Sequence, residues 1–209
     1  LLFLNPDTEV RGTALSALAS IADADPGVGI VGPCLLNSDG SIQIESTRAY
    51  PTIVSEVLES RFLQIRFPRL NLWGIRPLFS GATTPSSVDV VSGACLFIKR
   101  DVFERVGGFS DRYFMYSEDI DLCWKVKKAG WAVMFAPQAK VVHHGGGSSA
   151  LAPVSQFVAV LSRESRFRFF KYSRGAVYSS VYRCAMAVSA LCRLILLLVA
   201  YPILRIART

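Results

Sequence analysis

Three carboxylates lie close together in Glu118-Asp119-Ile120-Asp121, a stretch that stands at the expected start of a helix. Ser117 can cap this helix, so the carboxylates fall in its first turn, where the positive end of the helix dipole stabilises them. One such group can act as a general base. The stretch is equally typical of a well-capped helix start, in which Asp121 pairs with Lys125 four residues later.

A second set of possible ligands follows expected strands. Asp7 comes after the apolar run Leu1–Leu4, and open α/β sheets bind ligands beyond the carboxyl ends of their strands, although Asp7 is also a plausible helix cap. His143 and His144 are the only histidines, and they precede Gly145-Gly146-Gly147. Carboxylate oxygens and imidazole nitrogens suit Mn²⁺ or Mg²⁺, with phosphate oxygens and water completing the coordination. The glycines would let a phosphate approach the backbone.

The elements that must position these residues alternate between strands and helices. This alternation predicts an α/β fold with a largely parallel sheet, in which the first strand is central and covered on both faces. Residues 48–87 are rich in Pro, Gly, Ser and Thr and are expected to form mainly a variable surface loop. Strands are expected at 1–4, 28–31, 88–98, 132–136 and 139–143, a hairpin at 35–44, and helices from 7 or 8 onward, near 53–63, at 101–106 and at 117–129.

The chain changes character at residue 156, becoming first basic and aromatic and then strongly apolar. Its longest late charge-free runs, 184–192 and 194–204, are shorter than the ~20 residues of a clean membrane span. We expect an amphipathic helix or helical hairpin lying in a membrane interface. The alternatives are a single tilted span and a core or partner-docking helix. Residues 1–155 are therefore separated from a membrane-association segment at 156–209.

The charge distribution argues against nucleic-acid binding. The net charge is +7, but residues 163–209 carry nine Lys and Arg against one Glu, a charge of +8, which leaves −1 for the first 162 residues. A nucleic-acid-binding domain would carry the basic surface on its folded core. The five cysteines have no C-x-x-C spacing, which favours a reducing compartment and gives no sign of a structural zinc site.

Four segments, in order and at sensible spacing, resemble family 2 glycosyltransferases of the rhamnosyltransferase-like type. The resemblance covers roughly residues 1–175 and implies a GT-A-type, Rossmann-like, mostly parallel sheet flanked by helices. It also implies that 1–155 is the C-terminal part of a catalytic domain whose N-terminal nucleotide-binding units are missing. The matching segments are Leu4-Asn5-Pro6-Asp7-Thr8, 88–100 with Gly107-Gly108-Phe109, 116–124 and 142–148.

The resemblance also implies roles for individual residues. Asp119 would be the catalytic base and Glu118 its support, while Asp121 would bind the acceptor or position the helix. Asp7 and His143 would bind the metal, with His144 left open as the alternative ligand. The remaining positions would contact the acceptor (Gly93, Ala94, Trp124) or the donor (Asn5, Gly145, Gly146).

The implied function is inverting transfer of a sugar, with rhamnose favoured, from a nucleotide-diphosphate donor to a glycan or lipid-linked glycan. One base and one displacement give inversion. The expected cofactor is Mn²⁺ or Mg²⁺, and the expected place is the cytoplasmic face of the cell membrane, in cell-surface polysaccharide synthesis. The chain alone is expected to be inactive. A non-catalytic membrane-associated scaffold is the alternative, because Asn5 stands where the family often has its first acid.

Overall fold

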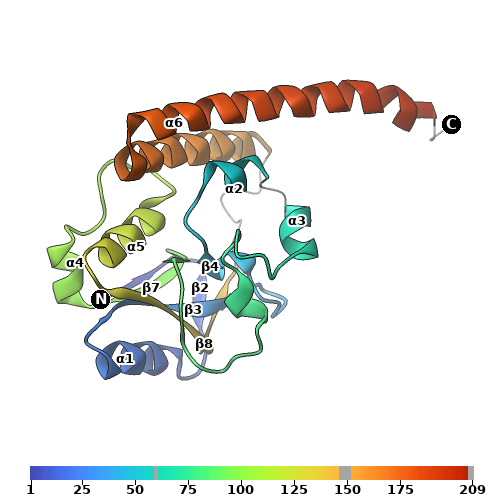
Figure 1. The fold of residues 1–209 in the computed structure, drawn as a ribbon. Coiled ribbons are helices and arrows are strands. Elements are labelled where there is room, and N and C mark those ends of the chain that lie inside the picture. The colour runs from blue at the N-terminus through green and yellow to red at the C-terminus, as the bar shows by residue number, and fades with distance from the viewer. Residues whose placement is uncertain (59–60, 146–151, 207–209) are drawn as a thin grey trace.

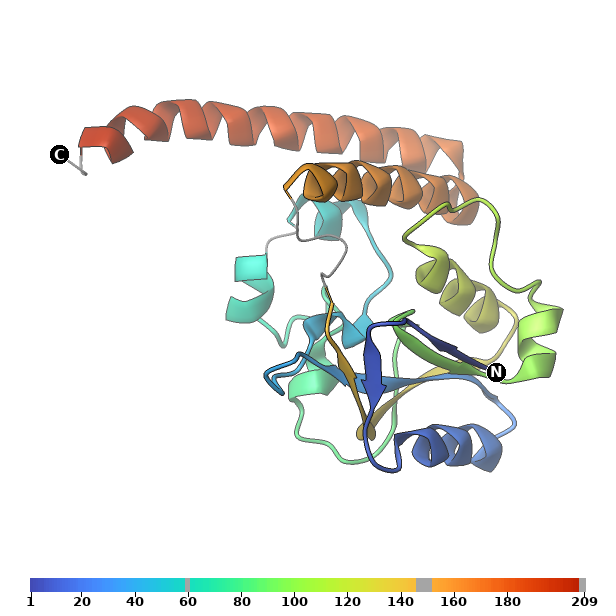
Figure 2. The same ribbon diagram turned by 180° about the vertical axis from the view of Figure 1, so that it is seen from behind.

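A mixed sheet forms the centre of the protein, and helices cover both of its faces. The computed structural model describes residues 1–58, 61–145 and 152–206. Figure 1 shows α1 (Ala14–Ala24) below the sheet, α5 (Glu118–Lys128) above it and α6 (Ala152–Ile206) across the top, and Figure 2 shows the same layers from behind. The expected α/β fold, with helices flanking a sheet, is confirmed.

The sheet is mixed rather than mostly parallel. Among the strands that the structure describes, only β3 and β8 pair in parallel, and every other pair in the sheet is antiparallel. The strand order is β1-β7-β3-β8-β2, with β5 also paired to β8. The bounds are Leu2–Leu4 for β1, Thr8–Val10 for β2, Val28–Leu36 for β3, Ser86–Ser87 for β5, Cys95–Ile98 for β7 and Ala132–His143 for β8.

The central strand is β3, because its continuous apolar run is covered on both faces. One face packs on Leu18 of α1, and the other belongs to a larger core around α5. A Cβ at Gly32 would lie 2.4 Å from the Cβ of Val91, so this position needs glycine for β6 (Val90–Val91) to approach.

Two expectations for the first residues are wrong. Within the described part of the chain β1 pairs only with β7, so it is an edge strand rather than a central parallel one. No helix begins at Asp7 or Thr8: residues Thr8–Val10 form β2 with Thr8 opposite His143, and α1 begins at Ala14. Pairing with β8 overrides the local helix signal, and it brings residue 7 beside the end of β8.

Several other expected elements are present with different bounds. The strand expected at 88–98 is divided into β6 and β7 by a turn at residues 92–94, and the two strands expected at 132–143 are one strand, β8, with a register shift. The helix expected near 53–63 is two short helices. The remaining elements are β4 (Thr47–Arg48), α2 (Ile53–Val57), α3 (Arg61–Arg66), α4 (Arg100–Arg105) and the 3₁₀ turns η1 (Ile44–Ser46) and η2 (Arg76–Phe79).

The last element, α6, is two helices joined at Gly175, whose φ of 89° lies outside the helical region. The first helix packs on the body through Phe169 and Phe170, which are 1% and 0% exposed, and the second begins on the body with Tyr182, which is 2% exposed. From Val188 onward the large apolar side chains of the second helix that the structure describes are exposed. Figures 1 and 2 show this part extending beyond the sheet.

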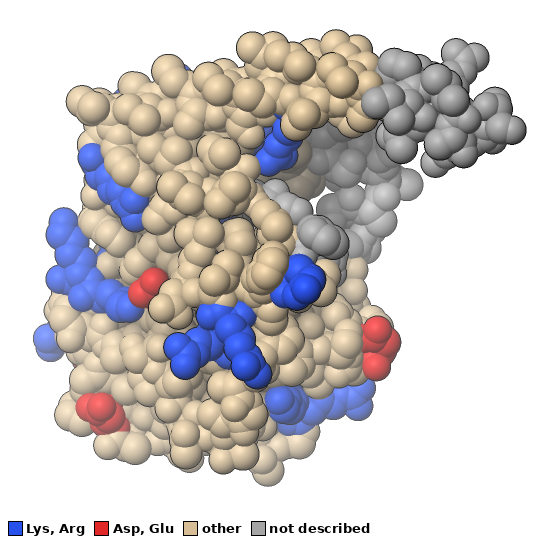
Figure 3. All heavy atoms as spheres, turned by 45° about the vertical axis from the view of Figure 1, so that its right-hand side comes forward, with Lys and Arg blue, Asp and Glu red and all other residues tan. Residues whose placement is uncertain are grey.

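The projecting part of α6 is apolar enough for a membrane. Among the described residues, Phe157–Ala200 is the one helical stretch long and apolar enough to cross a bilayer, with an 18-residue window of mean hydropathy 2.0 that is 0% buried. Figure 3 shows an almost uncharged surface at the top of the molecule and Lys and Arg gathered on the body below it.

Candidate active site

The end of β8 brings His143 to Asp7 across the β2–β8 pair. His143 Nε2 lies 3.4 Å from Asp7 Oδ1 and 3.4 Å from the side-chain amide nitrogen of Asn5. The backbone N–H of His144 donates to the carbonyl of Asp7 at 2.9 Å, which fixes the two chain segments together. His144 itself points to Ser38, whose Oγ lies 2.9 Å from its Nδ1. Successive side chains leave a strand on opposite faces, so only His143 reaches Asp7.

Gln43 sets the tautomer of His143. Its amide nitrogen donates to the carbonyl of His143 at 2.6 Å, and a carbonyl can only accept. The amide oxygen of Gln43 therefore faces His143 Nδ1, 3.0 Å away, and Nδ1 must carry the hydrogen. In the neutral ring, Nε2 then carries a lone pair, which faces both Asp7 and the side-chain amide of Asn5. Gln43 is 8% exposed, so the protein holds this arrangement in place.

This pair fits a divalent cation. A bare Nε2 and a carboxylate oxygen repel one another unless a proton or a metal ion lies between them. Adjacent ligands of an octahedral ion with bonds of about 2.1 Å stand about 3 Å apart, close to the observed 3.4 Å. No group of three or more His, Cys, Asp and Glu side chains gathers in residues 1–58, 61–145 and 152–206; at this strand end Asp7 and His143 meet, with Asn5 beside them.

The backbone is strained just before α5. Tyr116 and Ser117 both have a φ of 67°, in the left-handed region, where each non-glycine residue costs about 1–3 kcal/mol. Ser117 occupies the N-cap position but makes no side-chain capping bond in the described structure, contrary to expectation. The first helix of α6 holds the strained turn instead, since Ser165 Oγ donates to the carbonyl of Met115 at 2.7 Å and Arg166 Nη1 donates to Ser117 Oγ at 3.4 Å.

Asp119 is held at the start of α5 by three donors. Arg48 Nη2 donates to Oδ2 at 2.7 Å, the backbone N–H of Gly93 donates to Oδ2 at 3.2 Å, and the N–H of Ile120 donates to Oδ1 at 2.8 Å. A carboxylate has about four acceptor positions, so one remains for a further partner. A Cβ at Gly93 would lie 3.3 Å from the Cβ of Asp119, so a larger residue would crowd the carboxylate.

Glu118 carries a buried oxygen that the protein leaves open. Its Oε2 has no hydrogen-bond partner in the part of the chain that the structure describes. Burial raises the pKa of Glu118, and the neighbouring carboxylate of Asp119 adds to the rise. An atom of this kind needs an explanation in a native fold, and a bound hydroxyl group that donates to it is one.

Two short segments connect the Asp7 and Asp119 clusters. The segment at residues 43–48 carries Gln43, which orients His143, and Arg48, which binds Asp119. The turn at residues 92–94 carries Gly93, and its Ala94 carbonyl accepts from the backbone N–H of Asn5 at 2.9 Å. The segments are joined where the N–H of Ser92 donates to the carbonyl of Ser46 at 3.2 Å. These hydrogen bonds therefore connect the two clusters through the backbone.

Asp121 and Trp124 face away from this site. Asp121 is 0% exposed and accepts from Ser110 Oγ and, at 3.2 Å, from the hydroxyl of Tyr113, while Lys125 Nζ lies 3.5 Å away. Burial and the Asp121 carboxylate raise the pKa of Tyr113, which keeps it a donor. Of the two roles left open for Asp121, these contacts favour positioning the helix.

Trp124 packs edge-on against Phe169 and Tyr172 of α6, with ring centroids 6.5 and 5.3 Å away, so its ring is placed between helices. Gly145 lies beside the ring of His143, with a φ of 52°. Gly146 falls outside the described residues.

Gln43 and Arg48 are the site residues that sequence reasoning missed. Their partners lie 100 and 71 positions away, and neither residue belongs to a recognisable motif. Arg48 also begins the least legible stretch of the sequence. No local signal could have identified either one.

Comparisons with known proteins agree on one family. The sequence model described as "Glycosyltransferase like family 2" matches residues 2–166. The chain is 36% identical to the N-acetylglucosaminyl-diphospho-decaprenol L-rhamnosyltransferase of Mycobacterium tuberculosis, over 74% of this chain and 50% of that protein. It is 27% identical to Rhamnosyltransferase WbbL of Escherichia coli, over 69% of this chain and 52% of that protein. The chain thus spans about half the length of these curated relatives.

Among solved structures, the crystal structure of GalNAc-T7 with UDP, GalNAc and Mn²⁺ superposes with a TM-score of 0.47 and 15% sequence identity. The superposition covers 68% of this chain and 27% of that one.

Proposed function

The chain belongs to the glycosyltransferase-like family 2, and from this premise we propose that it carries the base and the metal ligands of an inverting sugar transferase. The donor is a nucleoside-diphosphate sugar, with rhamnose as the favoured sugar, and the acceptor is a hydroxyl group of a lipid-linked glycan. Two relatives named rhamnosyltransferases support this, one of them named for an N-acetylglucosaminyl-diphospho-decaprenol acceptor.

Asp119 is the residue on which the proposal rests, because three protein donors orient its carboxylate and leave one acceptor position open. In the proposed reaction the acceptor hydroxyl donates its proton to Asp119 while its oxygen forms a bond to the anomeric carbon. The bond from that carbon to the departing diphosphate breaks on the opposite face, which inverts the configuration. Glu118, with its open Oε2, accepts a second hydroxyl hydrogen of the acceptor and so orients it.

Asp7 and His143 are the proposed ligands of Mn²⁺ or Mg²⁺. When bound, the cation supplies positive charge that offsets the negative charge developing on the departing diphosphate. Gln43 keeps the lone pair of His143 directed to this place, and the turn at residues 92–94 holds Asn5 next to it. Asn5 and Gly145, at the edge of the same cluster, face the donor side in this proposal.

The proposed location is the cytoplasmic face of the cell membrane. The long apolar helix α6 supports attachment to a membrane, as does the lipid-linked substrate in the name of one relative. Sugar transfer at that surface suits the synthesis of cell-surface polysaccharide.

The test is the Asp119→Asn variant of the full-length protein. Loss of the base should lower the rate of sugar transfer by about 10²–10⁴-fold, because proton transfer by a positioned group contributes that much. Binding of the nucleotide sugar and of Mn²⁺ should be retained. Asp101→Asn, which changes an exposed carboxylate on α4, is the matched control and should keep full activity. Full activity in Asp119→Asn would remove Asp119 as the base.

A non-catalytic membrane-associated scaffold is the second candidate, supported by Asn5, a neutral residue beside the proposed metal. It predicts that the full-length protein binds nucleotide sugar and membranes but transfers no sugar to any lipid-linked acceptor. Transfer that Asp119→Asn abolishes would exclude it.

A further inference from the structure

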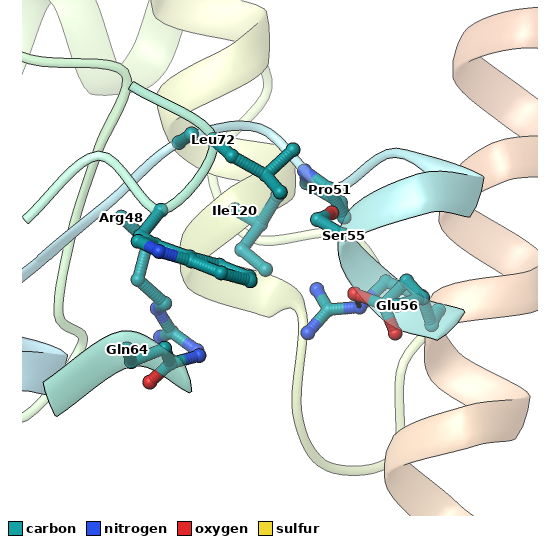
Figure 4. A pocket seen from close by; sticks show the side chains of 10 residues that line it. Arg48, Pro51, Ser55, Glu56, Gln64, Leu72 and Ile120 are labelled. Atoms are coloured by element: carbon teal, nitrogen blue, oxygen red, sulfur yellow. Dashed lines mark ion pairs between the residues drawn. The ribbon is translucent and has the colours of Figure 1, made fainter. Parts of the chain in front are cut away.

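An open pocket lies beside the proposed base, and the proposed reaction assigns it no ligand. Figure 4 shows Arg48 and Gln64 on one side of it and Ser55 and Glu56 of α2 on the other, with Ile120 of α5 near Leu72. The lining also includes Trp73 and, from α6, Arg166.

The polar groups of this pocket are mainly hydrogen-bond donors. Two guanidinium groups line it, and the buried Arg48 Nε and Trp73 Nε1 have no hydrogen-bond partner among the described residues. Glu56 is the one carboxylate in the described lining, and its Oε1 is paired with Arg166 Nε at 3.0 Å. A complementary ligand therefore supplies hydrogen-bond acceptors. Arginine's planar set of donors matches phosphate oxygens well.

Both arginines also contact the first residues of α5. Arg48 binds Asp119 at 2.7 Å, and Arg166 reaches Ser117 at 3.4 Å. An anion between the two guanidinium groups would thus lie next to the carboxylate that faces the acceptor hydroxyl. The pocket is placed for a charged part of the acceptor that lies close to its reacting sugar.

The exposed apolar surface of α6 passes next to the same pocket. Arg193 of the second helix donates to the carbonyl of Val57, at the end of the α2 wall, at 2.8 Å. Beyond this contact Leu194 and Leu196 through Leu198 are 53–67% exposed. A ligand could therefore place an anionic group in the pocket and lay an attached long apolar chain along the exposed side chains of α6.

We propose that this pocket binds the diphosphate of a lipid-linked acceptor through Arg48 and Arg166, and that the lipid chain leaves along the exposed face of α6. The proposal rests on the proposed function. Glu56 holds Arg166 in place until the ligand arrives, and it competes with the diphosphate for that guanidinium group.

The experiment measures binding of a diphosphate by the full chain in detergent micelles, by isothermal titration calorimetry. The probes are inorganic pyrophosphate and farnesyl diphosphate, both with EDTA, so that no metal at Asp7 and His143 can hold them. Farnesyl diphosphate should bind at least tenfold more tightly than pyrophosphate, because its apolar chain adds contacts. Equal affinity would overturn the proposed path along α6.

Two variants with opposite expected effects test the pocket itself. Arg166→Gln should weaken farnesyl diphosphate binding at least tenfold, and Glu56→Gln should strengthen it several-fold, because it removes the competing carboxylate. Lys171→Gln, which removes a charge from the same helix outside this pocket, should change the affinity less than twofold. If the ion pair serves only to hold α2 to α6, binding will weaken in both pocket variants or in neither, and the inference is then wrong.

Further measurements separate a failure of folding and a failure of the proposed function from a failure of this inference. Arg166→Lys keeps the charge without the planar set of donors, so it should bind with intermediate affinity if Arg166→Gln does not fold; wild-type affinity in this variant would overturn the assignment. Asp119→Asn should bind the probes. If Arg166→Gln keeps both sugar transfer and probe affinity, the diphosphate pocket is wrong and the proposed function stands. If the wild-type protein binds the probes tightly but transfers no sugar, the pocket is supported and the proposed function is contradicted.

Discussion

Asp119 and Asp121 stand two positions apart on α5 and have different surroundings. Asp121 is fully buried and bound by Ser110, Tyr113 and Lys125, whereas Asp119 is bound by Arg48 and two backbone N–H groups at the edge of a pocket. Both fall in the first helical turn, so the sequence alone does not show which of the two is the better candidate for the base. The hydrogen-bond partners of the two carboxylates therefore separate the proposed base, Asp119, from a structural carboxylate.

Glu118 predicts a dependence of stability on pH. Because burial raises its pKa above 4.5, the folded protein keeps a proton on Glu118 at pH values where the unfolded chain has lost it. The free energy of unfolding therefore falls as the pH rises from the unfolded pKa through the folded one. We expect Glu118→Gln to raise the melting temperature at pH 7 but not at pH 4, as measured by circular dichroism. Glu45→Gln, on an exposed side chain, is the control, and a less stable Glu118→Gln at pH 7 would contradict the argument.

Gln43 predicts a change in metal binding. Gln43→Leu removes the groups that fix the tautomer of His143, and loss of such an outer partner typically lowers metal affinity about 10–100-fold. Titration of Mn²⁺ by electron paramagnetic resonance, with a nucleoside diphosphate present, measures this. The control is Gln138→Leu, the same change at an exposed position of β8. Equal Mn²⁺ affinity in Gln43→Leu and wild type would argue against His143 as a ligand.

At the scale of elements, the sequence was sufficient for α4 and α5, whose bounds agree with the expected ones closely, whereas β3 begins where expected but continues to Leu36, into the expected hairpin. It was insufficient for Thr8–Val10, where a helix cap and a strand look alike until β8 is present to pair with. Apolar periodicity also could not predict the direction of the strands, since only pairing across the sheet distinguishes an antiparallel neighbour from a parallel one.

The candidate site was predictable to the extent that it lies in motifs. Asp7 and His143 do meet, although 136 positions separate them, because Asp7 precedes β2, whose Thr8 pairs with His143 at the end of β8. Trp124 was assigned to the site by its neighbours in the sequence, but on a helix its position directs it to α6. The side on which a residue of α5 lies follows from the packing of α5 and not from the motif.

The whole molecule has a charged body and an apolar projecting helix, and this predicts membrane binding (Figure 3). Replacing Leu191, Leu194 and Leu198 by Ser should abolish flotation with anionic vesicles. Burying each leucine contributes about 1.5–3 kcal/mol, so even partial burial of three makes a difference on the order of 100-fold.

Matched substitutions on the body serve as the control for vesicle binding. Leu15, Leu70 and Phe79 are 42–48% exposed, and replacing them by Ser should leave flotation unchanged. Extraction at high pH then distinguishes a helix that lies in the membrane interface from one that spans the membrane, because only the interfacial helix is released. Flotation of the leucine variant at the wild-type level would favour a helix that docks to a protein partner.

The contacts of the first α6 helix with the turn before Asp119 bear on how the protein can be dissected. Ser165 and Arg166 hold that turn, and Phe169, Phe170 and Tyr182 lie in the core. A soluble derivative cut at residue 155 would therefore lose the support of α5, the helix that carries the proposed base. The useful place for a stop codon is after Met186, where α6 still packs against the core and beyond which its exposed apolar stretch begins.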